Sequence, residues 1–440
     1  MNSITWRKQS PLLALFCANF ISLTGSALTT LAIPWFVLQT TGSVVKTGIS
    51  AFFTIVPTIL ANFFGGVLVD RVGYKRISVI SDLVAGAGIL LIPLFYHTVG
   101  LPFVALLLLI FLATLLNGPG GTARLSLIPD LAELADMPLE RATSISQGIG
   151  HIAILVGAPL AGVLIALVGT SNVLWIDALS FGLSALIVSV AVPMLLKTSA
   201  ETTQTQETAQ AQEQPIDLVQ VEKPGFLADL WGGIHFILRD KLILAILFTL
   251  VMTNMLDTSV TAVVTPFYVK QIFGNPVVLG LMDASFVGAA LLGTVLYGAI
   301  GHRLRRDVTL ALALVFVGVR FWVLALLPPL PFILLVMAVS GFAASPLNPI
   351  IFTIAYERIP AEVRGRVLGI GMAFTALGMP VGVLASGYLL NGIGIPATLL
   401  IMGASYLLVS LSLLLNPTLY KLRKANPVLN ETEAQEVAAN

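Results

Sequence analysis

Long apolar segments alternate with short polar breaks over most of this chain. An α-helix needs about 20 predominantly apolar residues to cross the hydrocarbon core of a bilayer. Segments of this kind recur, and charged residues, glycines and prolines separate them. The pattern predicts twelve membrane-spanning helices, at residues 11–37, 45–69, 77–97, 101–128, 143–168, 171–196, 241–267, 277–300, 308–328, 331–356, 366–391 and 396–416.

Composition supports a multi-pass membrane protein and excludes several other classes. Only 10% of the residues are charged and 57% are hydrophobic, whereas about 25% are charged in a typical soluble domain. The net charge of +1 argues against nucleic-acid binding, which depends on many lysines and arginines. The single cysteine, Cys17, excludes a disulfide framework and a cysteine-built metal site. We therefore expect no metal, no cofactor and no nucleic-acid partner.

The basic residues predict the orientation of the chain. If both termini and the even-to-odd connections share one side of the membrane, that side holds 20 of the 23 lysines and arginines. Lys46 and Lys270 fall on the other side, and Arg320 lies within a span. Because cytoplasmic loops carry an excess of basic residues, we expect both termini in the cytoplasm. The first apolar run is too long for a signal peptide, so it is interpreted as a retained span.

A polar segment divides the chain into two halves. Residues 199–226 hold five acids and one lysine, and such a composition favours disorder. The segment is either a tether between the halves or a regulatory element. Residues 226–239 place apolar groups at helical spacing, as in helices that lie along a membrane surface. The expected units are an N-terminal six-helix bundle (1–198), a cytoplasmic linker (199–240), a C-terminal six-helix bundle (241–418) and a cytoplasmic tail (419–440).

The two halves also repeat short motifs. The segment 65–76 after the second span has a weaker copy at 298–306 after the eighth. Gly-Ala-Pro at 157–159 in the fifth span corresponds to Gly-Met-Pro at 378–380 in the eleventh. A repeat of six plus six helices is typical of secondary transporters, whose substrate site lies between the repeats near the middle of the membrane.

These motifs resemble those of the major facilitator superfamily. The segment 66–76 is similar to the family's hallmark loop between spans two and three. Residues 157–162 resemble the Gly-Pro motif of its antiporter branches, although Ala158 separates the glycine from the proline. The stretches 25–43, 127–142 and 175–181 are similar to the drug-efflux branch that includes macrolide and enterobactin-type siderophore exporters. The residues that carry the two motifs are Gly66, Asp70, Arg71, Gly73, Lys75 and Arg76, and Gly157, Pro159 and Gly162.

The resemblance implies the family fold, an all-α protein with twelve helices in two pseudo-symmetric bundles. It also implies alternating access and proton-coupled export across the inner (plasma) membrane. In that setting Asp70, at a helix end among bases, could pair with the opposite half in the outward-facing state. The alternative is that the loop is a simple basic anchor. The glycines of the fifth span either seal one side of the interface or serve ordinary helix packing.

Five ionisable residues fall inside predicted spans, where charges are costly and therefore candidates for function. They are Asp82, Asp177, Asp257, Asp283 and Arg320. Asp82 lies near the bases of the hallmark loop, so we expect a structural ion pair there. Asp177 lies near the outer end of the sixth span, and we expect a polar contact at the helix end.

Asp257 is the strongest candidate for a functional charge. It lies 16 residues after Lys241, or about 24 Å along a helix axis. A carboxyl group removed from water binds a proton more readily, so Asp257 is predicted to bind the proton or a cationic substrate. Asn254 lies on the same face, and Asp283 is a possible partner of Asp257. The alternative is that Asp283 pairs with Arg320 and holds the second half together. Further candidates for the cavity wall are Asn19, Phe20 and Asn117.

The leading functional hypothesis is a secondary exporter of amphipathic compounds such as an antibiotic or a siderophore. The expected partners are the small substrate, protons as the coupling ion and the lipid bilayer, and the chain is expected to act as a monomer. The alternatives are an uptake permease for a small nutrient and a membrane sensor on the same fold. The chain has no GxxxxGK[ST] loop for ATP and no nucleophile–base constellation, so we do not expect an enzyme.

Overall fold

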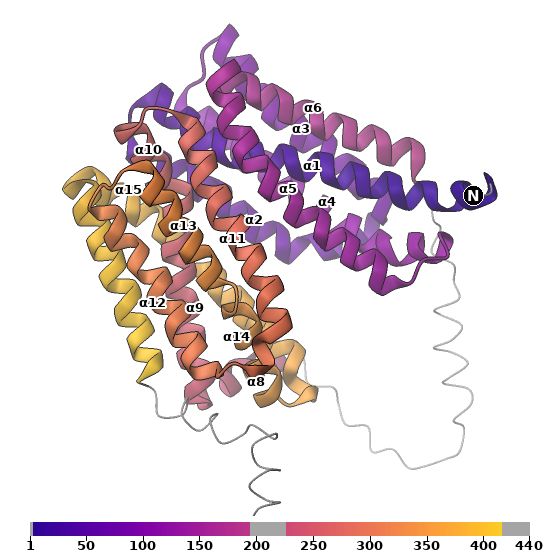
Figure 1. The fold of residues 1–440 in the computed structure, drawn as a ribbon. Helices are drawn as coiled ribbons and strands as arrows, with labels where there is room; N and C mark the ends of the chain where they lie inside the picture. The colour runs from indigo at the N-terminus through magenta and orange to yellow at the C-terminus, as the bar shows by residue number, and fades with distance from the viewer. Residues whose placement is uncertain (1–2, 194–225, 416–440) are drawn as a thin grey trace, which may run out of the picture.

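The computed structural model describes residues 3–193 and 226–415, and the regular elements in these ranges are helices (Figure 1). Eleven of these described helices are long and apolar enough to cross a membrane. Most of the predicted linker and the predicted tail lie outside the described residues. We refer to residues 3–193 as the N-terminal half and to residues 226–415 as the C-terminal half.

The N-terminal half contains six long helices at the positions of the first six predicted spans. Two of the turns between them occur at Gly73 and Gly169, whose φ angles of 97° and 84° lie in the left-handed region that favours glycine. The helices are α1 (Ser3–Thr41), α2 (Val44–Val72), α3 (Tyr74–Thr98), α4 (Phe103–Leu134), α5 (Leu139–Val168) and α6 (Thr170–Ala191).

The C-terminal half begins with a short helix at the segment whose apolar spacing predicts one. It continues with elements at the positions of the remaining predicted spans. They are α8 (Phe226–Arg239), α9 (Lys241–Ser259), η1 (Val260–Val264), α10 (Thr265–Ile272), α11 (Pro276–Ile300), η2 (Gly301–Arg303), α12 (Arg306–Ala325), α13 (Leu330–Ala344), α14 (Leu347–Arg358) and α15 (Ala361–Leu414).

Two spans of this half depart from a regular helix, and one long helix covers two predicted spans. In the seventh, α9 and α10 are joined by the π-helical turn η1. Pro266 follows that turn, and proline cannot donate the backbone hydrogen bond that a regular helix requires. In the tenth, Pro346 separates α13 from α14. The 54 residues of α15 include Gly394, whose non-helical backbone separates the eleventh predicted span from the twelfth.

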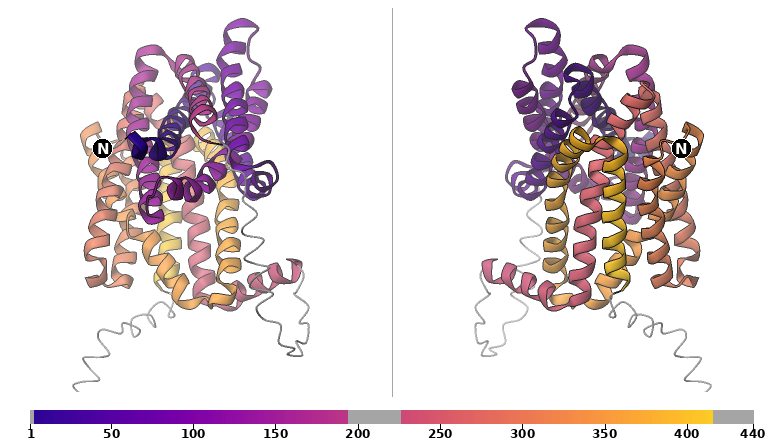
Figure 2. Two further views of the ribbon diagram at one scale, coloured as in Figure 1. Left: turned by 90° about the vertical axis from the view of Figure 1, so that its right-hand side faces the viewer. Right: turned by 90° about the vertical axis from the view of Figure 1, so that its left-hand side faces the viewer.

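Helix packing is extensive within each half. In the N-terminal half, α1 packs on α5 and α6, and α3 packs on α4 and α6. In the C-terminal half, α15 packs on α9 and α12, and α11 packs on α13. The pairs α5–α11 and α2–α15 join the two halves, and α1 adds contacts to η1 and α10. Figures 1 and 2 show the two groups of helices side by side, with the helices of the N-terminal half from indigo to magenta.

The contacts that join the halves lie near the ends of helices. A Cβ atom at Gly48 of α2 would stand 2.7 Å from the carbonyl oxygen of Val383 in α15. Lys270 of α10 donates a hydrogen bond to the carbonyl oxygen of Leu38, near the C-terminus of α1. The turns next to these contacts, between α1 and α2 and between α10 and α11, each connect an odd-numbered span to the following even-numbered span. We call this side of the molecule, where Gly48, Lys270 and their partners meet, the closed face.

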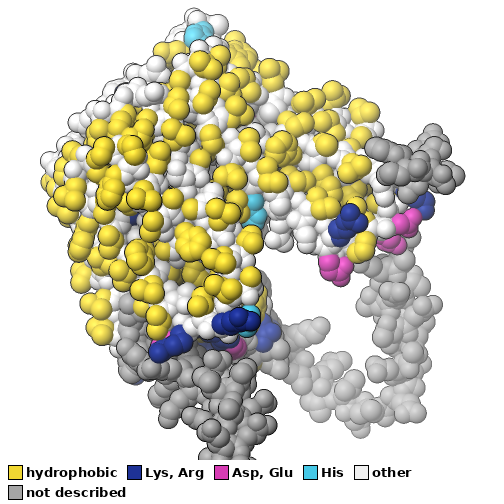
Figure 3. Space-filling model, viewed as in Figure 1, with side chains coloured by type: hydrophobic (Ala, Val, Ile, Leu, Met, Phe, Trp, Pro, Cys, Tyr) yellow, Lys and Arg dark blue, Asp and Glu magenta, His cyan; other side chains and the backbone are white. Residues whose placement is uncertain are grey.

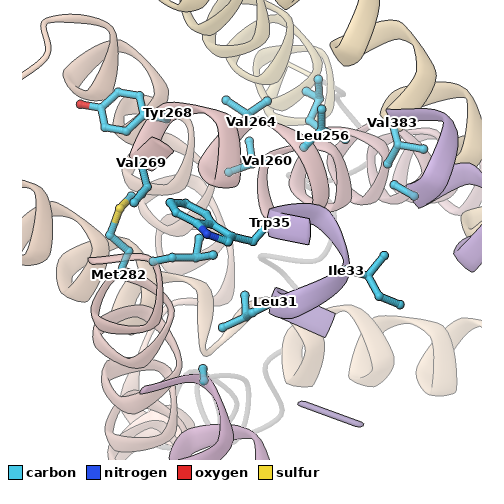
Figure 4. Close-up of a cluster of buried hydrophobic side chains, with 14 of the residues drawn as sticks. Leu31, Ile33, Trp35, Leu256, Val260, Val264, Tyr268, Val269, Met282 and Val383 are labelled. Atoms are coloured by element: carbon cyan, nitrogen blue, oxygen red, sulfur yellow. The ribbon is translucent and has the colours of Figure 1, made fainter. Parts of the chain in front are cut away.

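An apolar cluster fills the closed face (Figure 4). Trp35 of α1 is 6% exposed and lies between the C-terminal half's η1–α10 segment and α11, close to Val264, Tyr268 and Met282. The molecule is hollowed between the halves on another side, and the lysines and arginines of the visible face gather there (Figure 3). The halves therefore meet on one side and part on the other.

Candidate functional site

A cavity of about 550 Å³ lies between the two halves. Its wall comes from α1, α2, α3, α4 and α6 on one side and from α9 and η1 on the other. Most of the wall is apolar, and hydroxyl groups interrupt it. The hydroxyl-bearing residues are Ser26, Thr29, Thr30, Ser50, Thr54, Thr58, Thr114, Thr258 and Thr261. A wall of this kind suits amphipathic molecules, which need apolar contact and a few hydrogen-bonding groups.

Asp257 supplies the cavity wall with a carboxylate from the C-terminal half. It lies two residues before the end of α9 and forms an ion pair with Arg320 of α12. The Asp257 side chain is 40% exposed while that of Arg320 is 5% exposed, so the carboxylate faces the cavity and the guanidinium lies behind it. The guanidinium carbon stands 5.1 Å from the ring centre of Phe286 and 4.9 Å from that of Phe321. These rings favour the buried cation through their π faces.

The alternative pairing of Asp283 with Arg320 is wrong, because Arg320 pairs with Asp257. Asp283 is half-buried on α11 and does not line the cavity. Within the described part of the chain, no hydrogen bond or ion pair joins its carboxylate to another side chain. Sequence places Asp257 and Asp283 at similar depths but does not specify which way each helix turns them.

Asp177 differs from its prediction as a contact at a helix end. It lies seven residues inside α6, which begins at Thr170, and it is fully buried. Its carboxylate accepts hydrogen bonds from Thr29 of α1 and, over 3.2 Å, from Ser180. A Cβ atom at Gly25 of α1 would overlap this carboxylate, so the two helices can approach here only because residue 25 is glycine. Asp177 also lines the cavity.

Asp82 forms the expected structural ion pair, but not with the bases of the hallmark loop. Its carboxylate accepts two hydrogen bonds from Arg124 of α4, over 2.7 and 2.9 Å, and one from Ser184 of α6, over 2.7 Å. Arg124 and Asp82 are both buried. Arg124, one of the 20 basic residues counted toward the cytoplasmic side, therefore has its side chain inside the N-terminal half.

The hallmark loop is described in part. Gly73 makes the turn between α2 and α3. Lys75 donates a hydrogen bond over 2.8 Å to the carbonyl oxygen of Ser189 near the C-terminus of α6, where a positive charge is favourable. Arg71 and Arg76 are exposed. The side chain of Asp70 lies outside the described part of the structure, so its pairing with the opposite half stays a prediction, as does the role of Gly66.

The glycine motif of the fifth span makes both helix-packing contacts and contacts between the halves. A Cβ atom at Gly157 would stand 2.6 Å from the Cβ of Ala27 in α1, in the same half. A Cβ atom at Gly162 would stand 2.7 Å from the carbonyl oxygen of Pro276 in α11. A Cβ atom at Gly280 of α11 would stand 2.9 Å from the Cα of Pro159. Residues 159 and 162 therefore belong to the closed face.

The other predicted cavity residues divide between three places. Asn117 lines the main cavity. Asn19 and Phe20 are half-buried on α1 and are not among its lining residues. Asn254 lines a second, smaller cavity of about 170 Å³ between α8, α9, α14 and α15.

Sequence reasoning missed most of the hydroxyl groups in the wall. Ser50, Thr54 and Thr58 follow one another at a spacing of four residues in α2, which places them on one face of a helix. The sequence alone therefore contains the signal for a hydroxyl-bearing face on α2. The position of Asp177 inside a span marks it as a candidate for function, but no spacing reveals its partner Thr29, which lies 148 residues away.

Comparison with known proteins identifies relatives over nearly the whole chain. The profile of the Major Facilitator Superfamily matches residues 15–256 and 247–438. The multidrug efflux pump Tap of Mycobacterium tuberculosis (strain H37Rv) is 30% identical over 94% of this chain and 95% of its own. Macrolide efflux protein A of Streptococcus pyogenes is 22% identical over 90% of this chain and 93% of its own. The crystal structure of the nucleoside transporter NupG superposes with a TM-score of 0.72 at 14% identity, covering 91% of this chain and 98% of that one.

Proposed function

Because the chain belongs to the major facilitator superfamily and is a multi-pass transporter of the inner (plasma) membrane, we propose that it exports amphipathic small molecules by proton-coupled alternating access. The observation that carries this proposal is the cavity between the halves, with its apolar and hydroxyl-lined wall. The similarity to a multidrug efflux pump and to a macrolide efflux protein supports export.

The proposed orientation places both termini and the hollowed side toward the cytoplasm. The gathering of lysines and arginines on that side supports this orientation through the positive-inside rule. The two halves, as two six-helix bundles, would then be closed toward the outside and open toward the cytoplasm. This is the state in which an exporter takes up its cargo. Rocking of the halves would open the closed face and release the cargo outside.

The cavity favours a lipophilic cargo over the charged nutrient of an uptake permease. A site for a charged nutrient needs several charged groups in its wall, whereas among the described residues the charged ones that line this cavity are Asp177 and Asp257. Asp257 is positioned to attract a cationic group of the cargo, since its carboxylate faces the cavity. Macrolides and cationic dyes are amphipathic molecules that carry such a group, and siderophore-like compounds belong to the wider amphipathic class.

Export can be tested by dye accumulation in cells. Cells that express the chain are expected to accumulate several-fold less ethidium than cells with an empty vector, because the chain returns the dye to the medium. A protonophore is expected to abolish the difference by removing the proton gradient. The measurement is intracellular ethidium fluorescence at steady state, together with growth in the presence of macrolides. Equal accumulation and equal growth with and without the chain would refute the proposal.

A further inference from the structure

Asp177 is distinguished from the other buried acids by its partners. Asp82 has a buried arginine beside it, and so does Asp257. Asp177 is one of the residues that line the cavity, and its carboxylate is held by the hydroxyl groups of Thr29 and Ser180. No arginine, lysine or histidine within the described ranges forms an ion pair with it.

Hydroxyl partners allow this carboxyl group to gain and lose a proton without leaving a buried polar atom unpaired. A hydroxyl group can donate one hydrogen bond and accept others, and it rotates to do either. Thr29 and Ser180 can therefore both donate to the ionised carboxylate, and either one can accept the single O–H of the protonated form. Ser180 keeps a further acceptor in the backbone oxygen of Asp177, over 2.8 Å.

Asp257 lacks this property. Arg320 can only donate hydrogen bonds, and its buried Nε atom already has no partner. Protonation of Asp257 would remove the counter-charge of a cation that is 5% exposed, and a buried charge without its partner is strongly unfavourable. A reversible proton site needs protonated and ionised states of similar free energy. The surroundings of Asp177 meet this need better than those of Asp257.

The charged and titratable groups around Asp177 are distant. On α3, Asp82 meets α6 at Ser184 and His97 meets it at Ser171, about 10 Å along the helix on either side. On α5, His151 is exposed. On α1, Gly25 and Thr29 lie against Asp177, and neither residue titrates. Asp257, paired with Arg320, lines the same cavity from the C-terminal half.

We propose that Asp177 is the proton-binding residue of this transporter, an inference that rests on the proposed function. When the halves open to the outside, water in the cavity delivers a proton to a carboxylate oxygen of Asp177. When they open to the cytoplasm, the proton returns to water on that side. Each cycle thus removes an unpaired negative charge from the cavity wall and then restores it, while Asp257 with Arg320 remains ionised and faces the cargo.

The test separates proton coupling from binding in the purified full-length chain, reconstituted into phosphatidylethanolamine–phosphatidylglycerol liposomes. Two rates are measured, the uptake of ethidium driven by an acidic lumen and the exchange of ethidium without a gradient. We expect Asp177→Asn to lose gradient-driven uptake at least tenfold and to keep exchange within about twofold. The amide oxygen of asparagine can still accept from Thr29 and Ser180, so binding and rocking remain. The matched control is Asp283→Asn, which replaces a membrane acid outside the cavity and is expected to keep both rates.

A second variant keeps the inference testable if Asp177→Asn does not fold. Thr29→Val removes a donor to the carboxylate at constant volume, and so favours its protonated form. The midpoint of the pH profile of uptake is expected to rise by about one pH unit. Gradient-driven uptake that persists in Asp177→Asn, the loss of both rates in a folded preparation of that variant, or an unchanged midpoint in Thr29→Val would overturn the inference. A wild-type chain without gradient-driven uptake would instead overturn the proposed function itself.

Discussion

Replacement of Arg124 by alanine is expected to lower the free energy of unfolding by about 3–5 kcal/mol. The Asp82 side chain is fully buried and that of Arg124 is 5% exposed. Without the guanidinium, the Asp82 carboxylate keeps only the hydrogen bond from Ser184 and has no counter-charge. The measurement is unfolding of the purified protein in mixed detergent micelles, followed by circular dichroism.

Two matched variants separate the loss of this ion pair from the loss of an arginine. Arg306→Ala removes a pair with Glu357 whose side chains are 48% and 46% exposed, so it is expected to cost less than about 1 kcal/mol. The double variant Asp82→Asn with Arg124→Met removes both charges and is expected to recover most of the loss. Equal stability of Arg124→Ala and Arg306→Ala would show that the buried Asp82–Arg124 pair does not stabilise the packing of α3 on α4.

Replacement of Gly162 by alanine is expected to reduce export about tenfold by preventing the halves from closing. The added Cβ would stand 2.7 Å from the carbonyl oxygen of Pro276 and 3.1 Å from the Cα of Val277. Both neighbours are backbone atoms, so α5 and α11 must separate to make room. Overpacking of this kind costs about 1–3 kcal/mol. The cost falls only on the state in which α5 and α11 are in contact, so it destabilises that state relative to the other. The measurement is the rate of ethidium efflux from preloaded cells.

The control for this variant lies in the same helix. Gly148 of α5 has nothing within 4 Å of an added Cβ, so Gly148→Ala is expected to keep the wild-type rate and to add slightly to helix stability. Gly280→Ala, which meets α5 from the other side, is expected to behave like Gly162→Ala. Normal efflux in both interface variants would show that contact between α5 and α11 is not needed for transport.

The fold could be predicted from sequence to a large extent, because hydropathy determines where a span begins and ends. The predicted spans correspond to the helices of the structure, and Gly394 accounts for the division of α15 into two spans. The helix at 226–239 follows from its apolar spacing. The departures in the seventh and tenth spans occur at Pro266 and Pro346, where a missing backbone donor disturbs a regular helix.

The partners of the charged residues could not be predicted in the same way. Depth along a helix follows from residue number, but the direction in which a side chain points depends on how neighbouring helices turn and pack. Asp257 and Asp283 lie at similar depths, yet only Asp257 lies opposite Arg320. Asp82 lies close in sequence to the bases of the hallmark loop, yet its partner comes from α4. Asp177 meets α1 at a point that only Gly25 permits.

The claim that one cavity opens alternately to the two sides of the membrane can be tested by cysteine accessibility. Cys17 is exposed, so the variant carries Cys17→Ser together with Thr54→Cys in the cavity wall. A membrane-impermeant maleimide is applied from the outside to intact cells and from the cytoplasmic side to inverted vesicles. We expect rapid labelling from the cytoplasmic side at rest, and labelling from the outside only once ethidium and a proton gradient are present. Lys270→Met, which removes a contact of the closed face, is expected to raise the outside rate. Labelling from both sides at rest, or from one side under every condition, would contradict alternating access through this cavity.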